Sequence, residues 1–400
     1  MNGAFGKCAL HIFTEHLMSK AAMTKPFIRL DFLDVLRFFA ILYVVISHLV
    51  LIPQPNLAIP DWIAPFLING GDAGVSLFFV LSAFSLSYSM NARVNESSPT
   101  RSFYIRRFFR IAPLFYFLMV LYWIRDAAVF HVLHPVSEVL VNASLLFNLV
   151  PSCITGFVWA SWTIGVIALL YLIFPFIHRY VRNLYGALGL FVASVLMAWG
   201  WSYFVKNFGV STGYLTPDDI SFVWGFGFLQ HLPVFVCGVV VYHLFFDYLI
   251  KMNQKSRQLY GIILIIAFIL FYGVLLTESM QNILWGKKIL HGICFSLLVM
   301  GLGLKPFDFL VNSRTAYLGK ISYSMYLFHP LLIFTIIPVY RWIYNTVPTN
   351  LAGYLTSLLI ILVILAPISM ISYRYIEQTG MALGEKIISG KLHVQTYNQR

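Results

Sequence analysis

The sequence predicts an all-α integral membrane protein with about ten transmembrane helices and with both termini in the cytoplasm. Hydrophobic residues make up 60% of its 400 residues and charged residues only 10%, whereas roughly 25% of an ordinary soluble domain is charged. Mean hydropathy is +0.80. Apolar runs of about 18 residues or more recur along the whole chain, and each can cross a bilayer as a helix. This composition excludes a soluble protein.

The expected helices follow one another from residue 30 to residue 374. The segment 137–150 is apolar but too short to span, and we interpret it as a re-entrant or interfacial piece. We expect a cytoplasmic tail at residues 1–29, a membrane domain at 30–376 and a second cytoplasmic tail at 377–400. The expected spans are 30–52, 72–90, 109–126, 158–178, 184–206, 225–247, 259–276, 283–303, 318–340 and 350–374.

The chain has a net charge of +12, and the distribution of its basic residues between alternate loops indicates its orientation. A basic balance can indicate nucleic-acid binding, but in a chain with this many spans it more often reflects basic cytoplasmic loops. Roughly four-fifths of the Lys and Arg residues fall on the side that contains both termini, which places that side in the cytoplasm. We therefore expect membrane lipids as partners, a multi-pass location in the cell (inner) membrane, and no nucleic acid.

The four cysteines are scattered along the chain, without a CxxC pair or the spacing of metal ligands. This pattern supports neither a disulfide framework nor a zinc site, and no metal is expected. All four are interpreted as small apolar packing residues: Cys8, Cys153, Cys237 and Cys294.

The first expected helix, LDFLDVLRFFAILYVVISHL, contains four ionisable residues. Ionisable groups inside a span are costly and indicate function. Asp34 precedes Arg37 by one helical turn and can neutralise it. His48 follows Arg37 by eleven residues, which returns to nearly the same helix face about 16 Å further along. Arg37 and His48 are therefore catalytic candidates; the alternative is an ion pair that orders the helix start, beside an interfacial histidine.

The segment RSFYIRRFFRIAPLFYF follows the second expected helix. It places Arg106 and Arg110 on one helix face, with Arg107 beside them. Three guanidinium groups can bind a pyrophosphate and a further phosphate at the membrane surface, as a nucleotide-like donor such as coenzyme A would require. The alternative is that these arginines are cytoplasmic anchors that contact anionic lipid.

The segment YLGKISYSMYLFHPLLI places Ser322, Tyr326 and His329 in a polar stripe on an otherwise apolar helix. Pro330 is expected to kink or loosen the helix there. His329 is interpreted either as a catalytic group or as one end of a satisfied interhelical hydrogen bond. Glu377, in SYRYIEQTG, can accept from a cytoplasmic arginine or act at the site; the alternative is a surface carboxylate.

Together these segments resemble the acyltransferase 3 family, integral-membrane enzymes that acylate cell-surface sugars and some small molecules. Arg37 and His48 resemble the family's Arg-x10-His motif, and FYIRRFFRIAP resembles its Arg-Arg-x-x-Arg-Ile-x-Pro motif. GGDAGVSLFFVLSAF is similar to Gly-Val-x-Leu-Phe-Phe-x-Leu-Ser-Gly-Phe, with Ala83 where a glycine is usual. HLPVFVCGVVVY is similar to the Leu-Pro-x-Phe-x-x-Gly helix, and LGKISYSMYLFHP and YRYIE resemble the two C-terminal motifs. The six matches occur in order over residues 30 to 385.

The resemblance implies an enzyme that transfers an acyl group, usually acetyl, from acyl-CoA to a sugar hydroxyl. The acceptor would be a cell-surface or lipid-linked polysaccharide, such as a lipopolysaccharide or an exopolysaccharide. The three arginines 106, 107 and 110 would hold the phosphates of acetyl-CoA. His48, with an ordinary pKa near 6.5, would act as the base or carry the acyl group itself.

The remaining expected site residues complete this picture. Arg37, Glu377 and His329 join His48 in the catalytic group. The residues expected to line the acceptor site are Ser82, Ser161, Trp162, Ser322 and Tyr326.

One departure from the family concerns WASWTIGVIALLYLIFP. It aligns with the motif Ser-Trp-Ser-Leu-x-x-Glu-x-x-Phe-Tyr, but Ile167 and Ala168 stand where the family usually has glutamate. Another carboxylate must then act instead, such as Glu377, Asp34 or one on an outer loop.

Three other functions fit the same pattern. The acceptor can be a small molecule rather than a polysaccharide. The chain can be a transporter, which ten spans with intramembrane charges would suit, although no internal repeat is visible. The missing glutamate can also mark a non-catalytic homologue. An oligomer is compatible with all of these.

Overall fold

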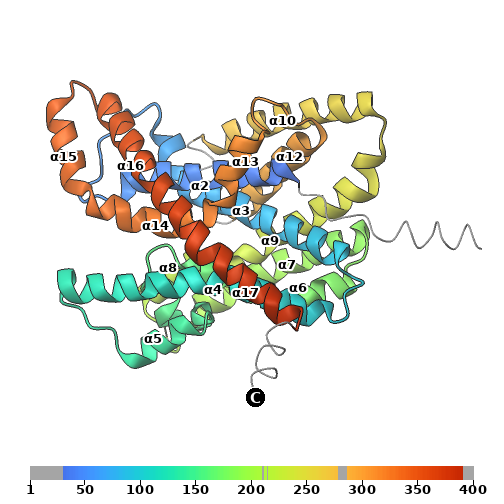
Figure 1. The fold of residues 1–400 in the computed structure, drawn as a ribbon, viewed down its shortest axis with the longest axis horizontal. Helices are drawn as coiled ribbons and strands as arrows, with labels where there is room; N and C mark the ends of the chain where they lie inside the picture. The colour runs from blue at the N-terminus through green and yellow to red at the C-terminus, as the bar shows by residue number, and fades with distance from the viewer. Residues whose placement is uncertain (1–29, 210, 214, 278–285, 391–400) are drawn as a thin grey trace, which may run out of the picture. The chain divides into compact units, whose positions relative to one another are not determined.

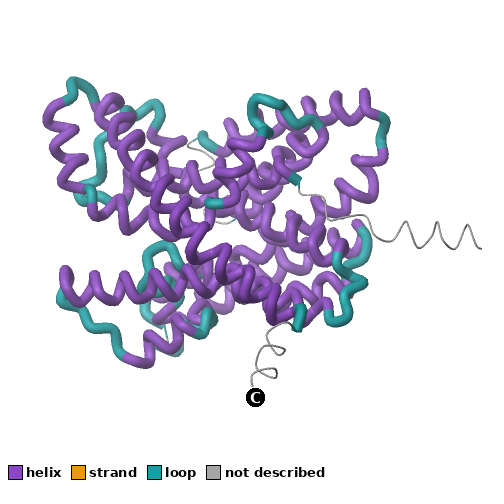
Figure 2. Tube along the Cα trace, in the orientation of Figure 1, coloured by secondary structure: helices purple, strands orange, loops and turns teal. Residues whose placement is uncertain are grey.

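The computed structural model describes residues 30–209, 211–213, 215–277 and 286–390. The expected N-terminal tail, residues 1–29, and the end of the expected C-terminal tail, residues 391–400, lie outside the described residues. All regular structure in the described part of the chain is helical (Figure 2). This confirms the all-α class.

Nine helical segments of the described chain are long and apolar enough to cross a membrane, and a bent pair of helices makes a tenth. The expectation of about ten spans is therefore confirmed; the cytoplasmic position of both termini stays a prediction. The segments are built on α2 (Asp31–Leu51), α3 (Ala64–Ala92), α4 (Pro99–Arg125), α6 (Trp162–Tyr180), α7 (Leu184–Phe204), α9 (Phe228–His243), α10 (Gln254–Leu275), α12 (Lys287–Leu304), α16 (Asn350–Ser372) and the pair α14 (Ser322–Thr335) and α15 (Ile337–Thr346).

Two helices begin earlier than expected because each has a proline in its first turn. α3 starts at Ala64 rather than at residue 72, and α4 starts at Pro99 rather than at residue 109. Proline suits the first turn of a helix because its missing N–H would have no partner there.

The ninth expected span is not continuous. α13 (Ser313–Lys320) and α14 are separate helices, and α14 meets α15 at a bend of 62°. The bend lies at Ile336, two residues before Pro338, whose ring would clash with a continuing helix. Pro330 stays inside α14 without interrupting it. Pro330 therefore does not end the helix, the expected kink there stays a prediction, and the break in the span precedes Pro338.

The last span is longer than expected. α16 continues through a π-helical turn (Tyr373–Glu377) into α17 (Gln378–Ile388), and α17 packs across α4 (Figure 1). Glu377 therefore lies inside a helix, where it is 1% exposed. Residues 137–150 contain only short pieces, α5 (Val136–Ala143) and a 3-10 turn at Phe147–Leu149, as a non-spanning segment should. α8 (Pro217–Phe226) precedes α9.

α2 and α3 form the interior of the bundle. Their most apolar windows are 61% and 78% buried, whereas those of α7 and α10 are 22% and 17% buried. α2 contacts α3, α12, α13, α14 and α16. The exposed apolar faces of α7 and α10 are those that lipid would cover, since lipid chains need no polar partner. Asp34 of the first span is therefore buried in protein and Arg37 and His48 are partly buried, whereas Asp31 at the start of α2 is exposed.

Two glycines allow the closest approaches between these helices. A Cβ at Gly319 of α13 would overlap the carbonyl oxygen of Asp34 on α2. A Cβ at Gly238 of α9 would overlap the carbonyl of Val80 on α3. Backbone cannot move aside as a flexible side chain can, so a methyl group at either position would separate the two helices.

We expect Gly319→Ala to lower the stability of the solubilised protein by about 1–3 kcal/mol, because the added methyl displaces α13 from α2. Thermal unfolding in detergent measures the effect. Gly273→Ala on α10 is the matched control, since no atom lies within 4 Å of its Cβ position, and it should be neutral or slightly stabilising. Equal melting temperatures for Gly319→Ala and wild type would contradict the close packing of α13 on α2.

Candidate active site

Two histidines from distant parts of the sequence form the centre of the site. His48 lies in the last turn of α2, and His329 lies fully buried in the middle of α14. His48 Nδ1 is 2.7 Å from His329 Nε2, and the two rings stack with centroids 5.0 Å apart. Both were catalytic candidates from the sequence, and the fold brings them together.

The partner of His329 defines which nitrogen of His48 carries the proton. His329 Nδ1 lies 2.5 Å from the carbonyl oxygen of Tyr326, which can only accept. Nδ1 of His329 must therefore carry a proton, and Nε2 of the neutral ring is an acceptor. His48 Nδ1 then donates to it, and Nε2 of His48 keeps a lone pair. That nitrogen is the one available to remove a proton or attack a carbonyl group.

A glycine keeps the surroundings of that nitrogen open. A Cβ added at Gly71 of α3 would lie 3.6 Å from Nε2 of His48. A Cβ there would be in van der Waals contact with this nitrogen, a contact that the glycine does not make.

His48 also lines a pocket of about 650 Å³ between the ends of α2, α4, α6 and α14. The pocket falls in the volume range of small-molecule sites. Its walls are mainly apolar, with several aromatic rings and a few charged groups. The lining residues used below are Arg125, Asp126, His134, Glu138, Trp159 and Trp162.

Of the five residues expected to line the acceptor site, one lines the pocket and four do not. Trp162 lines the pocket. Tyr326 holds the pocket wall, because its hydroxyl donates to the carbonyl of Ala160 and accepts from Thr163. Ser161 is fully buried and its hydroxyl donates to the carbonyl of Thr155, so it orders the turn before α6. Ser82 and Ser322 are not among the residues that line the pocket.

Arginines gather toward the other end of α2. Arg37 donates to Asp34 and to Ser85, each at 2.5 Å. Arg107 lies within electrostatic range of Arg37, Arg93 and Arg110. Its guanidinium group covers the rings of Phe103 and Tyr171 at 5.5 and 5.7 Å. Arg37, Arg93 and Arg110 each have a carboxylate partner, whereas Nε of Arg107 has no hydrogen-bond partner among the described residues, so Arg107 is the member of this group best suited to a bound anion.

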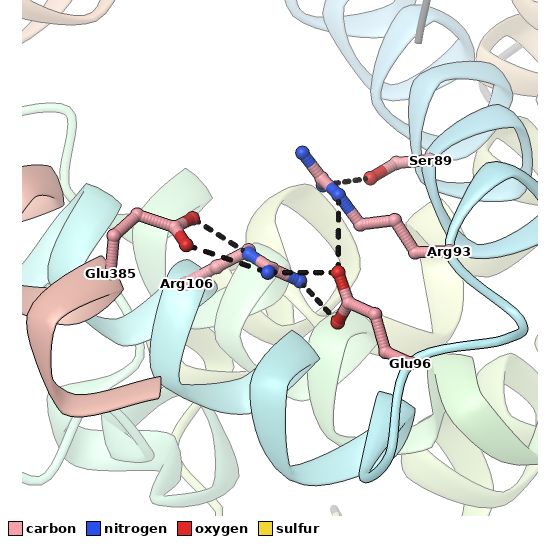
Figure 3. A network of polar contacts seen from close by, with 5 residues as sticks. All are labelled: Ser89, Arg93, Glu96, Arg106 and Glu385. Carbon is pink, nitrogen blue, oxygen red and sulfur yellow. Dashed lines mark hydrogen bonds and ion pairs between the residues drawn. The ribbon is translucent and has the colours of Figure 1, made fainter. Parts of the chain in front are cut away.

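Arg106 lies in a different environment from the other two arginines of its motif. Figure 3 shows it between two carboxylates: Glu96 accepts from it at 2.8 and 2.9 Å, and Glu385 of α17 accepts at 2.7 Å. Arg93 contacts Glu96 and Ser89 at the edge of this network. Arg106 thus joins α4 to α17 and to the loop before α4.

Glu377 is not a surface carboxylate, so that alternative is wrong. Its carboxylate accepts hydrogen bonds from Arg110 and from Ser324 of α14, and Ser324 also contacts Ser372 at 3.1 Å. The π-helical turn at the end of α16 directs Glu377 inward. This carboxylate neutralises Arg110 and joins α4, α14 and α16.

A row of hydrogen-bonded charged side chains lies on the pocket wall, and no role was predicted for it from the sequence. Arg125 Nε donates to Asp126 Oδ1 at 2.7 Å, and Asp126 Oδ2 lies 2.9 Å from His134 Nε2. His134 Nδ1 lies 3.0 Å from Glu138 Oε2. In the sequence, Asp126, His134 and Glu138 lie within one short segment. Only the fold shows that their side chains meet.

Both ring nitrogens of His134 face carboxylates. A neutral imidazole has one N–H, so both hydrogen bonds form only when His134 is protonated. Burial opposes that charge, but the hydrogen bonds with Asp126 and Glu138 outweigh it and raise the pKa of His134 above its ordinary value. Within the described residues, no group of three His, Cys, Asp or Glu side chains is arranged to hold a metal ion.

Comparisons with known proteins identify the family of the chain. Residues 30–373 match the family described as an acyltransferase domain. The chain is 25% identical to "Putative acetyltransferase ORF330" of Acidianus two-tailed virus, over 74% of this chain and 81% of that protein. It is 32% identical to "Acyltransferase MdmB" of Streptomyces mycarofaciens, over 39% of this chain and 41% of that protein. No solved structure matches.

The family match extends from the start of α2 into the turn that contains Glu377, and it includes both histidines of the central pair. The chain is a multi-pass membrane protein and an acyltransferase, and it belongs to the acyltransferase 3 family.

Proposed function

We propose that this enzyme transfers an acyl group, acetyl in the simplest case, from acyl-CoA to a sugar hydroxyl of a cell-surface or lipid-linked polysaccharide. The observation that carries the proposal is the His48–His329 pair, which leaves a lone pair on His48 Nε2 beside an open pocket. A base of this kind suits the removal of a proton from a hydroxyl group at neutral pH.

The arginine group supports acyl-CoA as the donor. Arg107 and Arg110 lie near Arg37, and Arg37 is about 16 Å from His48 along α2. In this arrangement Arg107, whose Nε has no hydrogen-bond partner among the described residues, binds the phosphates, and the extended pantetheine arm carries the thioester along α2 toward His48. Arg106, which already has two carboxylate partners, joins α4 to α17 instead of binding the phosphates directly.

In the proposed reaction, His48 Nε2 removes the proton of the acceptor hydroxyl. The oxygen attacks the thioester carbonyl, a C–O bond forms, and the C–S bond breaks. The departing thiolate takes the proton back from His48, so that the products are an ester and a free thiol. His329 accepts from His48 Nδ1 throughout and so keeps the lone pair of His48 on Nε2.

We expect His48→Ala to lower acetyl transfer from labelled acetyl-CoA into envelope glycan by about 10²–10⁴-fold, the usual contribution of a general base. His178→Ala is the matched control, because His178 lies near the end of α6 and does not line the pocket. The measurement compares label per unit of membrane enzyme. Equal incorporation by His48→Ala and wild type would refute the role of His48.

We expect His329→Leu to lower kcat roughly 5- to 150-fold with little change in KM for acetyl-CoA. The buried N–H of His48 loses its acceptor, at a cost of about 1–3 kcal/mol. His329→Asn offers an amide oxygen in place of the ring nitrogen and should restore part of the rate. A loss of protein without a change in specific activity would show a structural role only.

We expect Arg107→Gln to raise KM for acetyl-CoA about tenfold or more while leaving kcat nearly unchanged, because a charge-assisted hydrogen bond contributes about 1.5–3 kcal/mol. Arg182→Gln, on an exposed turn after α6, is the control. Steady-state kinetics with acetyl-CoA and with the shorter thioester acetyl-pantetheine tests whether Arg107 acts on the nucleotide phosphates. The shorter donor lacks these phosphates, so its KM should be insensitive to Arg107→Gln. Equal effects on both donors would contradict phosphate binding at Arg107.

A further inference from the structure

The proposed reaction leaves one wall of the pocket without a function. This wall consists of four hydrogen-bonded side chains between the end of α4 and α5: Arg125, Asp126, His134 and Glu138. The side chains of its first three members are only 8–10% exposed, whereas that of Glu138 is 30% exposed. All four side chains line the pocket, and Glu138 is the most exposed of them.

The charges of this wall cancel. Arg125 and the doubly hydrogen-bonded His134 are cations, and Asp126 and Glu138 are anions. Arg125 is further fixed by the rings of Tyr122, Trp159 and Phe130, whose centroids lie 4.2, 4.8 and 5.2 Å from its guanidinium carbon. The wall is thus rigid and electrically neutral, so it offers directed hydrogen bonds without a net attraction for an ion.

Aromatic side chains supply the rest of the surface. Trp159 and Trp162 both line the pocket and are half-buried. His134 stacks on Phe157 at 4.5 Å, which fixes the imidazole against the wall. Glu138 bonds to His134 through Oε2, and among the described residues none donates to Oε1. Flat apolar faces beside a carboxylate oxygen match a molecule with C–H faces and outward hydroxyl groups.

We propose that this wall is the acceptor subsite and that it selects an uncharged sugar ring, which packs on Trp159 and Trp162 and donates a hydroxyl to Glu138. A second hydroxyl of the same ring then reaches His48 Nε2 from the opposite side of the pocket. Uronic acids and phosphosugars are disfavoured, because their negative charge would meet Glu138 on a wall that carries no net positive charge. The assignment of the second hydroxyl rests on the proposed function; the binding of the ring does not.

The test is direct binding to the full-length chain in lipid nanodiscs, without acetyl-CoA. The probes are the methyl glycosides of glucose, galactose, mannose and N-acetylglucosamine, with methyl glucuronide as the charged comparison. Saturation-transfer NMR suits ligands that bind weakly. The variants are Glu138→Gln, which keeps the shape of the side chain, and Trp159→Ala. The controls are Asp308→Asn and Trp342→Ala, at exposed positions away from the pocket.

We expect at least one neutral glycoside to bind, the glucuronide to bind at least about fivefold more weakly, and both variants to weaken the neutral ligand at least about fivefold while the controls do not. The proposal is overturned if no neutral glycoside binds, if the glucuronide binds equally well, or if both variants retain wild-type affinity. Trp159→Phe and thermal unfolding identify a loss of binding that comes from misfolding. Retained sugar binding without acetyl transfer would refute the proposed reaction and leave this subsite intact.

Discussion

The placement of α2 is the constraint on which the rest of the site depends. The helix is among the most buried in the bundle and contains ionisable residues at both ends. Charged groups in a membrane interior persist only when they are paired or when they line a polar cavity. Asp34 pairs with Arg37 near one end, and His329 holds His48 at the other. Because the rise of a helix is fixed, Arg37 and His48 are held about 16 Å apart along α2.

The neighbours of α2 hold that geometry from both ends. Gly319 lets α13 lie directly on the backbone at Asp34, and Gly74 of α3 lets α3 lie against the carbonyl of Ala40. α14 follows α13 after a break at Ile321 and places His329 beside His48. The same helix also contributes Ser324, which binds Glu377. One short helix therefore connects the histidine pair with the carboxylate that neutralises Arg110.

Much of the fold was predictable because hydrophobic length alone identifies most spans. Expected helix bounds differ from the structure at prolines: α3 and α4 begin earlier, each with a proline in its first turn, and the ninth span is interrupted before Pro338 rather than at Pro330. In the site, Arg37, His48 and His329 were predictable, since ionisable residues in apolar runs are conspicuous. The burial of Glu377 was not, because it depends on a π-helical turn that brings α17 back onto α4. The separation of Arg106 from Arg107 was not predictable either, since only the fold brings Glu96 and Glu385 to one guanidinium group.

Burial explains in part why Ile167 and Ala168 stand where the family usually has a glutamate. Ile167 is 8% exposed and lies between the buried residues Val166 and Leu169 of α6. A lone carboxylate in such surroundings would need its own partner, since an unpaired buried charge is strongly unfavourable. Of the carboxylates that the sequence offers in its place, Glu377 and Asp34 are held by arginines away from the pocket. Asp126 and Glu138 share the pocket with His48 and are already stabilised by Arg125 and His134. In this chain the acidic groups that line the pocket together with His48 therefore come from the segment between α4 and α6, whereas α6 itself lines the pocket with Trp162.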